Sequence, residues 1–248
     1  MTMPHDTMEN SIPQASPPRS ALHIALRTAA ILLAFTLVFT TLMASAYYLM
    51  APRVAASAQA EKLRLIGVVL APSSDGLLNP SLDKTFYDND LLTDAITLPP
   101  TSALGTSEET RLFRARKNGQ PTALIFEATA PDGYSGKIGL LLAVSAEGQL
   151  LAMRVTQHKE TPGLGDYIDP KKDRNKVRPW ITQFSGIGFD SVPLEQWHVK
   201  KDGGHFDQMA GATISARAVT NASGRALAWV NDHREKLFAL PANRLYKE

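Results

Sequence analysis

The sequence predicts an α+β fold carried by a single transmembrane helix. Residues 28–52 contain no charged side chain and are rich in large apolar residues. After Pro121, apolar residues alternate with other residues along three segments, which is the two-residue period of a β-strand. After Thr213 they recur at spacings of three, four and seven residues, which is typical of a helix with one buried face. Strands followed by a helix indicate an α+β domain.

Composition limits the classes of function. The chain has 248 residues, 44% of them hydrophobic, which is ample for a folded core. Its formal net charge of +2 is too small to indicate a nucleic acid partner, and no zinc-finger or RNP-type pattern is present. There is no cysteine, so thiolate catalysis and iron–sulfur ligation are excluded. Any redox chemistry would therefore need a bound cofactor.

The N-terminal region is predicted to be a tail and a membrane anchor. Prolines and small polar residues dominate residues 1–23, which indicates a disordered tail. We expect a transmembrane helix over residues 24–52, since about 20 apolar residues cross the hydrocarbon layer. The alternative is a cleaved signal peptide, because Ala44-Ser45-Ala46 resembles a cleavage site, but the apolar run continues through Met50 and favours retention. Positive charges flank both ends of the run and give no orientation.

Residues 53–120 are predicted to connect this helix to the domain and to form the domain's N-terminal part. An Ala-rich pattern over residues 54–70 indicates that the helix continues beyond the membrane, and turn residues at 72–76 indicate its end. Between residues 79 and 110 neither period is sustained, so no element is predicted there.

The remaining chain is predicted to form a core over residues 121–240 and a short tail over 241–248. The alternating positions on one buried face are Leu124, Phe126 and Ala128, then Ile138, Leu140, Leu142 and Val144, then Leu151, Met153 and Val155. The turn Glu147-Gly148 joins the last two segments and predicts antiparallel strands. Tyr134 and Gly136 precede the second segment and on their own would be core and turn residues.

The first of two informative motifs is Asp-Gln-Met-Ala-Gly-Ala-Thr-Ile-Ser at residues 207–215. It places Thr213 at the N-terminus of the predicted helix, whose buried face comprises Val219, Ala222, Ala226, Val230 and Leu237. A phosphate would be stabilised there, because the first N–H groups of a helix lack partners and its dipole is positive at that end. We expect the small residues Gly211 and Ala212 to leave the hydroxyl accessible. The alternative is an ordinary Thr or Ser N-cap.

The second motif, Glu-Thr-Pro-Gly-Leu-Gly at residues 160–165, follows the third predicted strand. Thr161-Pro162-Gly163-Leu164 fits a type II turn, because Pro fixes φ at the second position and Gly tolerates positive φ at the third. We expect this turn to expose backbone N–H donors on a surface with few side chains, which suits the approach of a planar ring. The alternative is a tight turn without a ligand.

Both motifs resemble those of one protein family. The pattern Asp-x-x-x-Gly-Ala-Thr-x-Ser looks like the sequence that periplasmic flavin transferases recognise when they move FMN from FAD onto threonine. Residues 197–219 resemble the G subunit of the Rnf (Rsx) electron-transport complex, and both motifs also resemble the related C subunit of the sodium-pumping NADH:quinone reductase. One departure is Ala210, where the motif often has Ser or Thr.

The resemblance implies a flavoprotein that relays electrons, as one subunit of a complex, through FMN attached to Thr213 as a phosphoester. The flavin neighbours that it implies are Glu160, Thr161, Leu164, Gly165, Gly211, Ala212 and Ser215. The residues implied in recognition by the transferase are Asp207, Gly211, Ala212 and Thr213, although Asp207 could instead organise the turn. The resemblance further implies a cytoplasmic N-terminal tail, a C-terminal domain in the periplasm of a bacterial inner membrane, and partner subunits in a complex that couples electron flow to ion translocation or keeps a redox sensor reduced.

Two other classes of function compete with electron relay. A non-redox adaptor or ligand-binding module would use the Gly-rich turns only as structure. A threonine-nucleophile hydrolase would use Thr213 but needs a positioned base, and the sequence offers none that can be assigned. Within the redox class, the C subunit of the quinone reductase is the closer alternative. The chain is not expected to be catalytic alone.

Several remaining features have simple interpretations. The basic run at residues 171–178 is typical of a solvated loop, with docking to an acidic partner or lipid headgroups as the alternative. The histidines lack metal-ligand spacing, so no metal site is expected. Trp180, Trp197 and Trp229 are expected in the core or at an interface. There is no G-x-G-x-x-G fingerprint to indicate direct binding of NADH.

Overall fold

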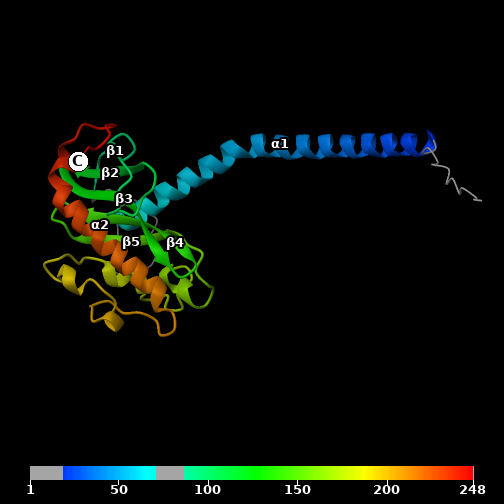
Figure 1. The fold of residues 1–248 in the computed structure, drawn as a ribbon. Coiled ribbons are helices and arrows are strands. Elements are labelled where there is room, and N and C mark those ends of the chain that lie inside the picture. The colour runs from blue at the N-terminus through cyan, green and yellow to red at the C-terminus, as the bar shows by residue number, and fades with distance from the viewer. Residues whose placement is uncertain (1–18, 71–86, 248) are drawn as a thin grey trace, which may run out of the picture. The chain divides into compact units, whose positions relative to one another are not determined.

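The computed structural model describes residues 19–70 and 87–247 (Figure 1). In chain order, the elements of these residues are α1 (Arg19–Leu70), β1 (Ala95–Leu98), β2 (Thr110–Lys117), β3 (Gln120–Gly133), β4 (Gly136–Ser145), β5 (Leu150–Gln157), the 3-10 helices η1 (Gly165–Ile168), η2 (Trp180–Phe184), η3 (Leu194–Gln196) and η4 (Lys200–Asp202), and α2 (Thr213–Ala239). The chain divides into two compact units, Met1–Gln59 and Ala60–Glu248.

The helix α1 contains the predicted membrane anchor. Among the described residues, Ala21–Val54 is the one helical span long and apolar enough to cross a membrane, with a mean hydropathy of 2.1. The helix passes through Pro52 and continues to Leu70, as the Ala-rich pattern predicts. It already begins at Arg19, so the last residues of the predicted tail are helical. The rest of that tail and the predicted stop at 72–76 lie outside the described residues.

The second unit is built on an antiparallel sheet with the strand order β1-β2-β3-β4-β5, in which each strand pairs with its neighbour in the sequence. The helix α2 packs against β3 and β4 (Figure 1). This arrangement confirms the predicted α+β class and the predicted antiparallel pairing.

Both faces of the sheet are buried, which corrects the expectation of one buried face. On the α2 side, Leu124 and Phe126 of β3 join the main core, together with Trp197 and Trp229 and with Trp180 at its margin. Every predicted inward position of β3 and β4 belongs to this core. The opposite face carries a second cluster of buried residues, Tyr87, Leu91, Ala95, Phe113, Ala115, Ala123, Ile125, Leu141, Ala143 and Ala152. Segments N-terminal to β2 therefore cover a face that the strand pattern alone left to solvent.

In the third predicted strand, β5, the predicted face is wrong for one residue, Leu151. Ala143 pairs with Ala152 and Val144 pairs with Leu150, so Leu151 lies in a register shift and has no partner across the ladder. A bulge of this kind moves the following residues to the other face of the strand. Leu151 packs against the second cluster, whereas Met153 lies in the main core.

The strands β1 and β2 lie where no element was predicted. The two-residue turn Asn118-Gly119 joins β2 to β3, with φ of 50° and 76°. These left-handed angles are typical of a type I′ hairpin turn, for which Asn-Gly is a preferred sequence. The strand pattern of β2 is obscured by Arg114, which is only 2% exposed.

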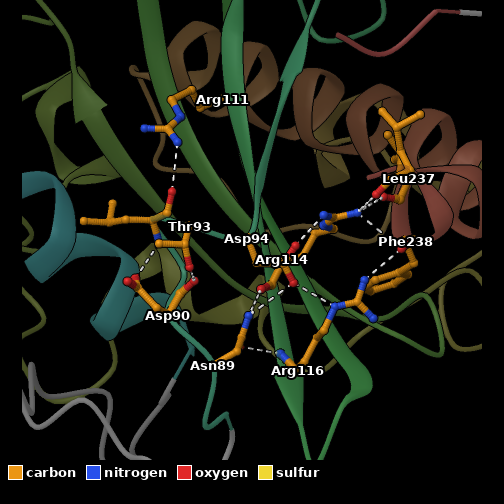
Figure 2. Close-up of polar contacts among 11 residues, drawn as sticks. Asn89, Asp90, Thr93, Asp94, Arg111, Arg114, Arg116, Leu237 and Phe238 are labelled. Atoms are coloured by element: carbon orange, nitrogen blue, oxygen red, sulfur yellow. Dashed lines mark hydrogen bonds and ion pairs between the residues drawn. The ribbon is translucent and has the colours of Figure 1, made fainter. Parts of the chain in front are cut away.

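Arg114 closes the C-terminal end of α2 (Figure 2). Its guanidinium donates hydrogen bonds to the carbonyl oxygens of Leu237, Phe238 and Leu240 and forms an ion pair with Asp94. Arg116 donates to the other oxygen of Asp94 at 2.7 Å and to the Phe238 carbonyl at 2.8 Å. Carbonyls that have no partner within the helix are thus satisfied by two cations from the neighbouring strand.

The chain's last residues lie along the edge strand β1. The N–H of Tyr246 donates to the Thr97 carbonyl at 2.8 Å, and the N–H of Asn243 donates to the Ala95 carbonyl at 2.7 Å. The residues predicted as a C-terminal tail therefore contact the sheet. The division of the unit at residues 120 and 240 stays a prediction.

Candidate functional site

Three segments that are far apart in the sequence meet beside the N-terminus of α2. They are the β3–β4 turn, the loop after β5, and residues 207–215. They line a cavity of about 290 Å³, which is near the lower limit for small-molecule sites. The lining residues are Tyr134, Glu160, Thr161, Leu164, Gly165, Gly211, Ala212, Ile214 and Ser215. Both sequence motifs thus belong to one site.

Every residue predicted as a flavin neighbour lines this cavity, but Thr213 itself does not. It lies between Ala212 and Ile214, which are both in the lining, and is 8% exposed. The residue as a whole is therefore buried, and the accessibility of its hydroxyl beside Gly211 and Ala212 stays a prediction. Within the described part of the chain, its hydroxyl makes no hydrogen bond.

Glu160 ties the three segments together. It is 4% exposed, and its carboxylate accepts a short hydrogen bond from the Ser215 hydroxyl and a second one, at 3.0 Å, from the backbone N–H of Ser135. Its own N–H donates to His158 Nδ1 at 3.2 Å. A buried carboxylate is stabilised by such donors, because burial without them is costly. Glu160 therefore fixes the cavity wall.

The predicted type II turn is present. The N–H of Leu164 donates to the Thr161 carbonyl at 3.1 Å, and Gly163 has φ of 76°. The expectation of exposed donors is wrong for two of the turn's N–H groups. Leu164 uses its N–H within the turn, and the Gly163 N–H donates to Asp166 Oδ1 at 2.9 Å. What the turn does present is the Leu164 side chain, which is 53% exposed.

Among the described residues, no side chain caps the N-terminus of α2. Its N-cap position is Ala212, which has no side-chain oxygen to accept a hydrogen bond, and the preceding Gly211 has φ of 81°. Ser215 uses its hydroxyl on Glu160 and does not cap the helix. The interpretation as an ordinary Thr or Ser N-cap is therefore wrong. The first N–H groups of α2 are left for another acceptor.

Tyr167 supports this helix start. Its hydroxyl accepts a hydrogen bond from the Met209 N–H at 3.1 Å and donates to the Ala212 carbonyl at 3.3 Å. Its ring meets Trp180 edge-to-face, with 5.5 Å between centroids. Burial raises the pKa of the Tyr167 phenol, so the group remains a neutral donor at physiological pH.

Asp207 lies apart from the cavity lining. Its side chain is 71% exposed and forms an ion pair with Lys200 at 2.6 Å. Its backbone anchors the start of the motif, since its N–H donates to Gln183 Oε1 at 2.8 Å and its carbonyl accepts from Trp180 Nε1 at 2.6 Å. Main-chain contacts therefore organise this turn, and the carboxylate faces solvent.

Two lining residues were not predicted as site residues. Tyr134, expected as a core residue, is 68% exposed, and Ile214 is 43% exposed. The signal for Tyr134 was a large aromatic residue in a turn between Gly133 and Gly136. A turn tip offers no core for such a ring, so its position alone indicated a surface role.

A family model described as FMN-binding domain matches residues 133–228, which include the whole cavity lining. The G subunit of the ion-translocating oxidoreductase complex of Vibrio cholerae is 38% identical over 211 residues, covering 85% of this chain and 92% of the relative. The protein of the same name from Photorhabdus laumondii is 44% identical over 164 residues, covering 66% and 76%. The chain belongs to the G subunit family of ion-translocating oxidoreductase complexes.

Membership of this family, with one apolar span in α1, indicates a flavoprotein anchored to the membrane by a single pass. Among solved structures, NqrC of Shewanella oneidensis is similar, with a TM-score of 0.42 and 19% identity over 68% of this chain and 79% of that one.

The residues around the cavity fit FMN. The isoalloxazine ring is planar and largely apolar, and Tyr134, Leu164 and Ile214 supply exposed apolar surface around the cavity. The phosphate needs N–H donors, and the first turn of α2 carries donors that no side chain caps. The ring and the phosphate would therefore each meet groups of suitable chemistry.

Proposed function

We propose that this protein relays electrons through an FMN held as a phosphoester on Thr213. The observation that carries the proposal is the start of α2, where the first helical residue is a threonine, the N–H groups are uncapped, and the residues on either side line the cavity. An anion at this position gains both the N–H donors and the favourable end of the helix dipole.

The roles of the surrounding residues follow from their contacts. Glu160 holds Ser215 and the β3–β4 turn in place, so that the cavity keeps its shape. Leu164 and Ile214 would cover apolar parts of the ligand and exclude water from them. Bound there, the flavin would supply reversible electron transfer, which no side chain of this cysteine-free chain offers.

Covalent attachment has a physical advantage for an anchored carrier. The occupancy of a reversible site depends on the ratio of free ligand concentration to Kd, whereas a phosphoester keeps the ligand when free FMN is dilute. This argument favours a domain outside the cytoplasm, and we propose that the unit after the membrane span lies in the periplasm, with the N-terminal tail in the cytoplasm.

We also propose that a flavin transferase recognises Asp207, Gly211, Ala212 and Thr213. The exposed carboxylate of Asp207 suits recognition by another protein, because it is accessible without disturbing the cavity. Since Thr213 is 8% exposed, attachment would require the start of α2 to open locally or would precede its final packing. The further partners would be the other subunits of an ion-translocating oxidoreductase complex, as the names of the relatives suggest.

The competing hypotheses find less support. A threonine nucleophile needs a base in hydrogen-bonding reach, and among the described residues none bonds Thr213, while Glu160 is engaged by Ser215. An adaptor without a cofactor would have no use for uncapped N–H groups beside a cavity. The C subunit of the quinone reductase would use the same cavity, and co-purification of the partner proteins distinguishes it.

The test is flavin fluorescence on a denaturing gel, with the intact mass recorded. The full-length protein is expressed with an active flavin transferase, and Thr213→Ala and Thr220→Ala are run beside it. Thr220 is a suitable control because it lies in the same helix and its buried hydroxyl has no hydrogen-bond partner among the described residues. Denaturation removes reversible flavin, so a fluorescent band reports a covalent bond.

We expect one FMN adduct on the wild-type protein and on Thr220→Ala, and none on Thr213→Ala. A dark wild-type band beside a transferase that modifies a known acceptor would rule out the covalent carrier. A fluorescent Thr213→Ala band would place the bond on another residue.

A further inference from the structure

We propose that residues 169–178, here called the basic loop, form the docking surface for an acidic redox protein that exchanges electrons with this site. The inference rests on the proposed function, because it identifies the chemistry of the partner that such a carrier needs. The sequence pattern alone left a solvated loop as the simpler interpretation.

The loop concentrates the positive charge of the chain. Its cationic side chains, all on exposed residues, are Lys171, Lys172, Arg174, Lys176 and Arg178. Five cations and the two carboxylates of Asp169 and Asp173 give the loop a formal charge of +3, which exceeds the +2 of the whole chain. One of these carboxylates is turned inward, since Asp173 is 5% exposed. A surface of one sign attracts and orients a partner of the opposite sign.

The loop is held in a defined conformation, unlike an ordinary solvated charge run. The Asp173 carboxylate accepts hydrogen bonds from the N–H of Asn175 at 2.9 Å and of Trp180 at 2.5 Å. The side-chain oxygen of Asn175 accepts from the Arg178 N–H at 3.0 Å, and Lys176 Nζ donates to the Lys171 carbonyl at 2.8 Å. Positions fixed in advance reduce the entropy lost on binding.

An apolar residue lies among the charges. Val177 is 81% exposed between Lys176 and Arg178. Apolar contact surrounded by a polar, charged rim is the usual composition of a protein–protein interface. Small interfaces of this kind are typical of electron-transfer encounters, which bind weakly and dissociate quickly.

The basic loop is connected to the cavity. It directly follows η1, whose first residue, Gly165, lines the cavity. At its other end Trp180 contacts the ring of Tyr167, whose hydroxyl bonds the Ala212 carbonyl one residue before Thr213. A partner on the loop would therefore lie beside the cavity, which electron exchange requires and binding to lipid headgroups does not. For this reason we favour an acidic protein over a lipid surface. The nearby carboxylate of Asp207 is paired with Lys200 and does not offset the loop.

The test measures electron transfer to an acidic probe. Full-length, flavin-loaded protein in nanodiscs of neutral phosphatidylcholine is reduced with dithionite and mixed in a stopped-flow instrument with the ferric haem domain of cytochrome b5, which is acidic. Each reduced flavin loses two electrons and releases its protons to solvent, and each ferric haem gains one electron, so two cytochromes are reduced per flavin. Basic mitochondrial cytochrome c serves as the probe of opposite charge.

The test variant combines Lys172→Glu, Arg174→Glu and Arg178→Glu, three side chains for which the structure shows no hydrogen bond within the described residues. The matched control combines Arg225→Glu, Lys236→Glu and Arg244→Glu, which are exposed and change the net charge equally. At low ionic strength we expect the loop variant to react with the acidic probe about tenfold or more slowly than the control variant. With the basic probe the order should reverse, and 0.5 M salt should remove both differences.

A second readout does not involve the flavin. Isothermal titration calorimetry should detect salt-dependent binding of the acidic cytochrome to flavin-free wild-type protein and to the control variant, and weaker binding to the loop variant. Equal rates and equal binding for the two variants would overturn the proposal. The proposal would also be overturned if the control variant and the loop variant reduced the acidic cytochrome at equal rates once phosphatidylglycerol replaces neutral lipid. The loop would then be bound to the membrane. Protein that binds no flavin would instead count against the proposed function, while the calorimetry would still test the loop.

Discussion

The two ends of α2 differ in how their unpaired backbone groups are capped. At the C-terminal end, the buried Arg114 and the neighbouring Arg116 satisfy the last carbonyl groups with cations from within the chain (Figure 2). At the N-terminal end, the N-cap is Ala212, no side chain in the described part of the chain caps the first N–H groups, and a cavity lies beside them. The helix dipole favours cations at one end and an anion at the other.

This difference separates stability from function along one helix. At the C-terminal end, the arginines of β2 supply the positive charge that the helix dipole favours. Removing these side chains should lower the free energy of unfolding. The N-terminal end has no such charge complement among the described side chains, and the proposed phosphate would provide it. Substitutions at the C-terminal end should therefore change stability, and substitutions at the N-terminal end should change flavin content.

Arg114→Met should cause the largest loss of stability. The change removes the donors to three carbonyl groups and one ion-pair partner of Asp94, so we expect a cost of about 3–5 kcal/mol, typical of breaking a buried ionic network. Denaturant unfolding of the full-length protein in detergent measures it. Arg111→Met, an exposed arginine of the same strand that donates one hydrogen bond to the Leu92 carbonyl at 3.0 Å, should cost about 1 kcal/mol or less. Below the unfolding transition, Arg114→Met should still carry covalent flavin. Loss of flavin from the folded variant would show that the two ends are not separate.

Gly165→Ala should affect the cavity end. A Cβ atom at this position would meet the Ser215 hydroxyl and lie 2.7 Å from Glu160 Oε2, so Ser215 or Glu160 must move. We expect a cost of about 1–3 kcal/mol and reduced flavin content per folded molecule. Gly163→Ala is the matched control, because its Cβ would meet nothing within 4 Å but its φ is 76°. It should cost about 1–2 kcal/mol from backbone strain alone and keep its flavin. Equal flavin content in both variants would contradict a role for the cavity shape.

Tyr167→Phe should have a smaller and pH-dependent effect. It leaves the Met209 N–H and the Ala212 carbonyl without their partner, at a cost of about 1 kcal/mol near neutral pH. Burial raises the phenol's pKa in the folded state, so the folded protein holds this proton more tightly than the unfolded chain does. The contribution of Tyr167 is complete below the unfolded pKa of about 10 and decreases as the pH rises above it. The difference in unfolding free energy between the wild-type protein and Tyr167→Phe should therefore be smaller above pH 10 than at pH 7. A difference that is the same at both pH values would show that the phenol is not buried.

Asp202→Asn should have the smallest effect. The hydrogen bond from Arg217, in the first turns of α2, lowers the pKa of the Asp202 carboxyl. A lowered folded-state pKa means that the stabilisation is present above the unfolded value of about 4 and is lost as the pH falls through the folded value. The pair is exposed, so we expect a small decrease in Tm at pH 7 that becomes smaller as the pH falls below about 4. Thermal unfolding at pH 7 and at several lower pH values checks it, and a decrease that stays constant over this range would show that the charge of Asp202 is not responsible.

The parts of the fold in which apolar residues recur with a single period, that of a strand or that of a helix, were predictable from the sequence. The inward positions of β3 and β4 and the buried face of α2 were correct, because each side chain there follows its local pattern. The type II turn was also predictable, since Pro162 fixes φ at the second position and Gly163 tolerates the positive φ that the third position requires. Both motifs contribute residues to the lining of one cavity. The resemblance implied this proximity, whereas the spacing of the residues alone could not show it.

The errors arose where a long-range contact overrides the local pattern. Arg114 has the character of a surface residue, but β2 buries it against carbonyl groups more than 120 residues away in the sequence. Leu151 was assigned to the wrong face because a register shift depends on the partner strand. Asn-Gly is a preferred sequence for a two-residue hairpin turn, so Asn118-Gly119 would have allowed β2 to be predicted as the strand paired with β3.

The C-terminal residues that lie along β1 cover the outer edge of the sheet. A free edge strand offers unpaired N–H and carbonyl groups to the edge of another molecule and is a common starting point for aggregation. Here the backbone around Leu245 pairs with Thr97, and at the opposite edge the N–H of Leu150 donates to the Ile187 carbonyl at 2.8 Å. A chain shortened before Asn243 would expose the β1 edge. The residues around Leu245, which line no part of the cavity, thus occupy backbone groups of β1 that another molecule could otherwise pair with.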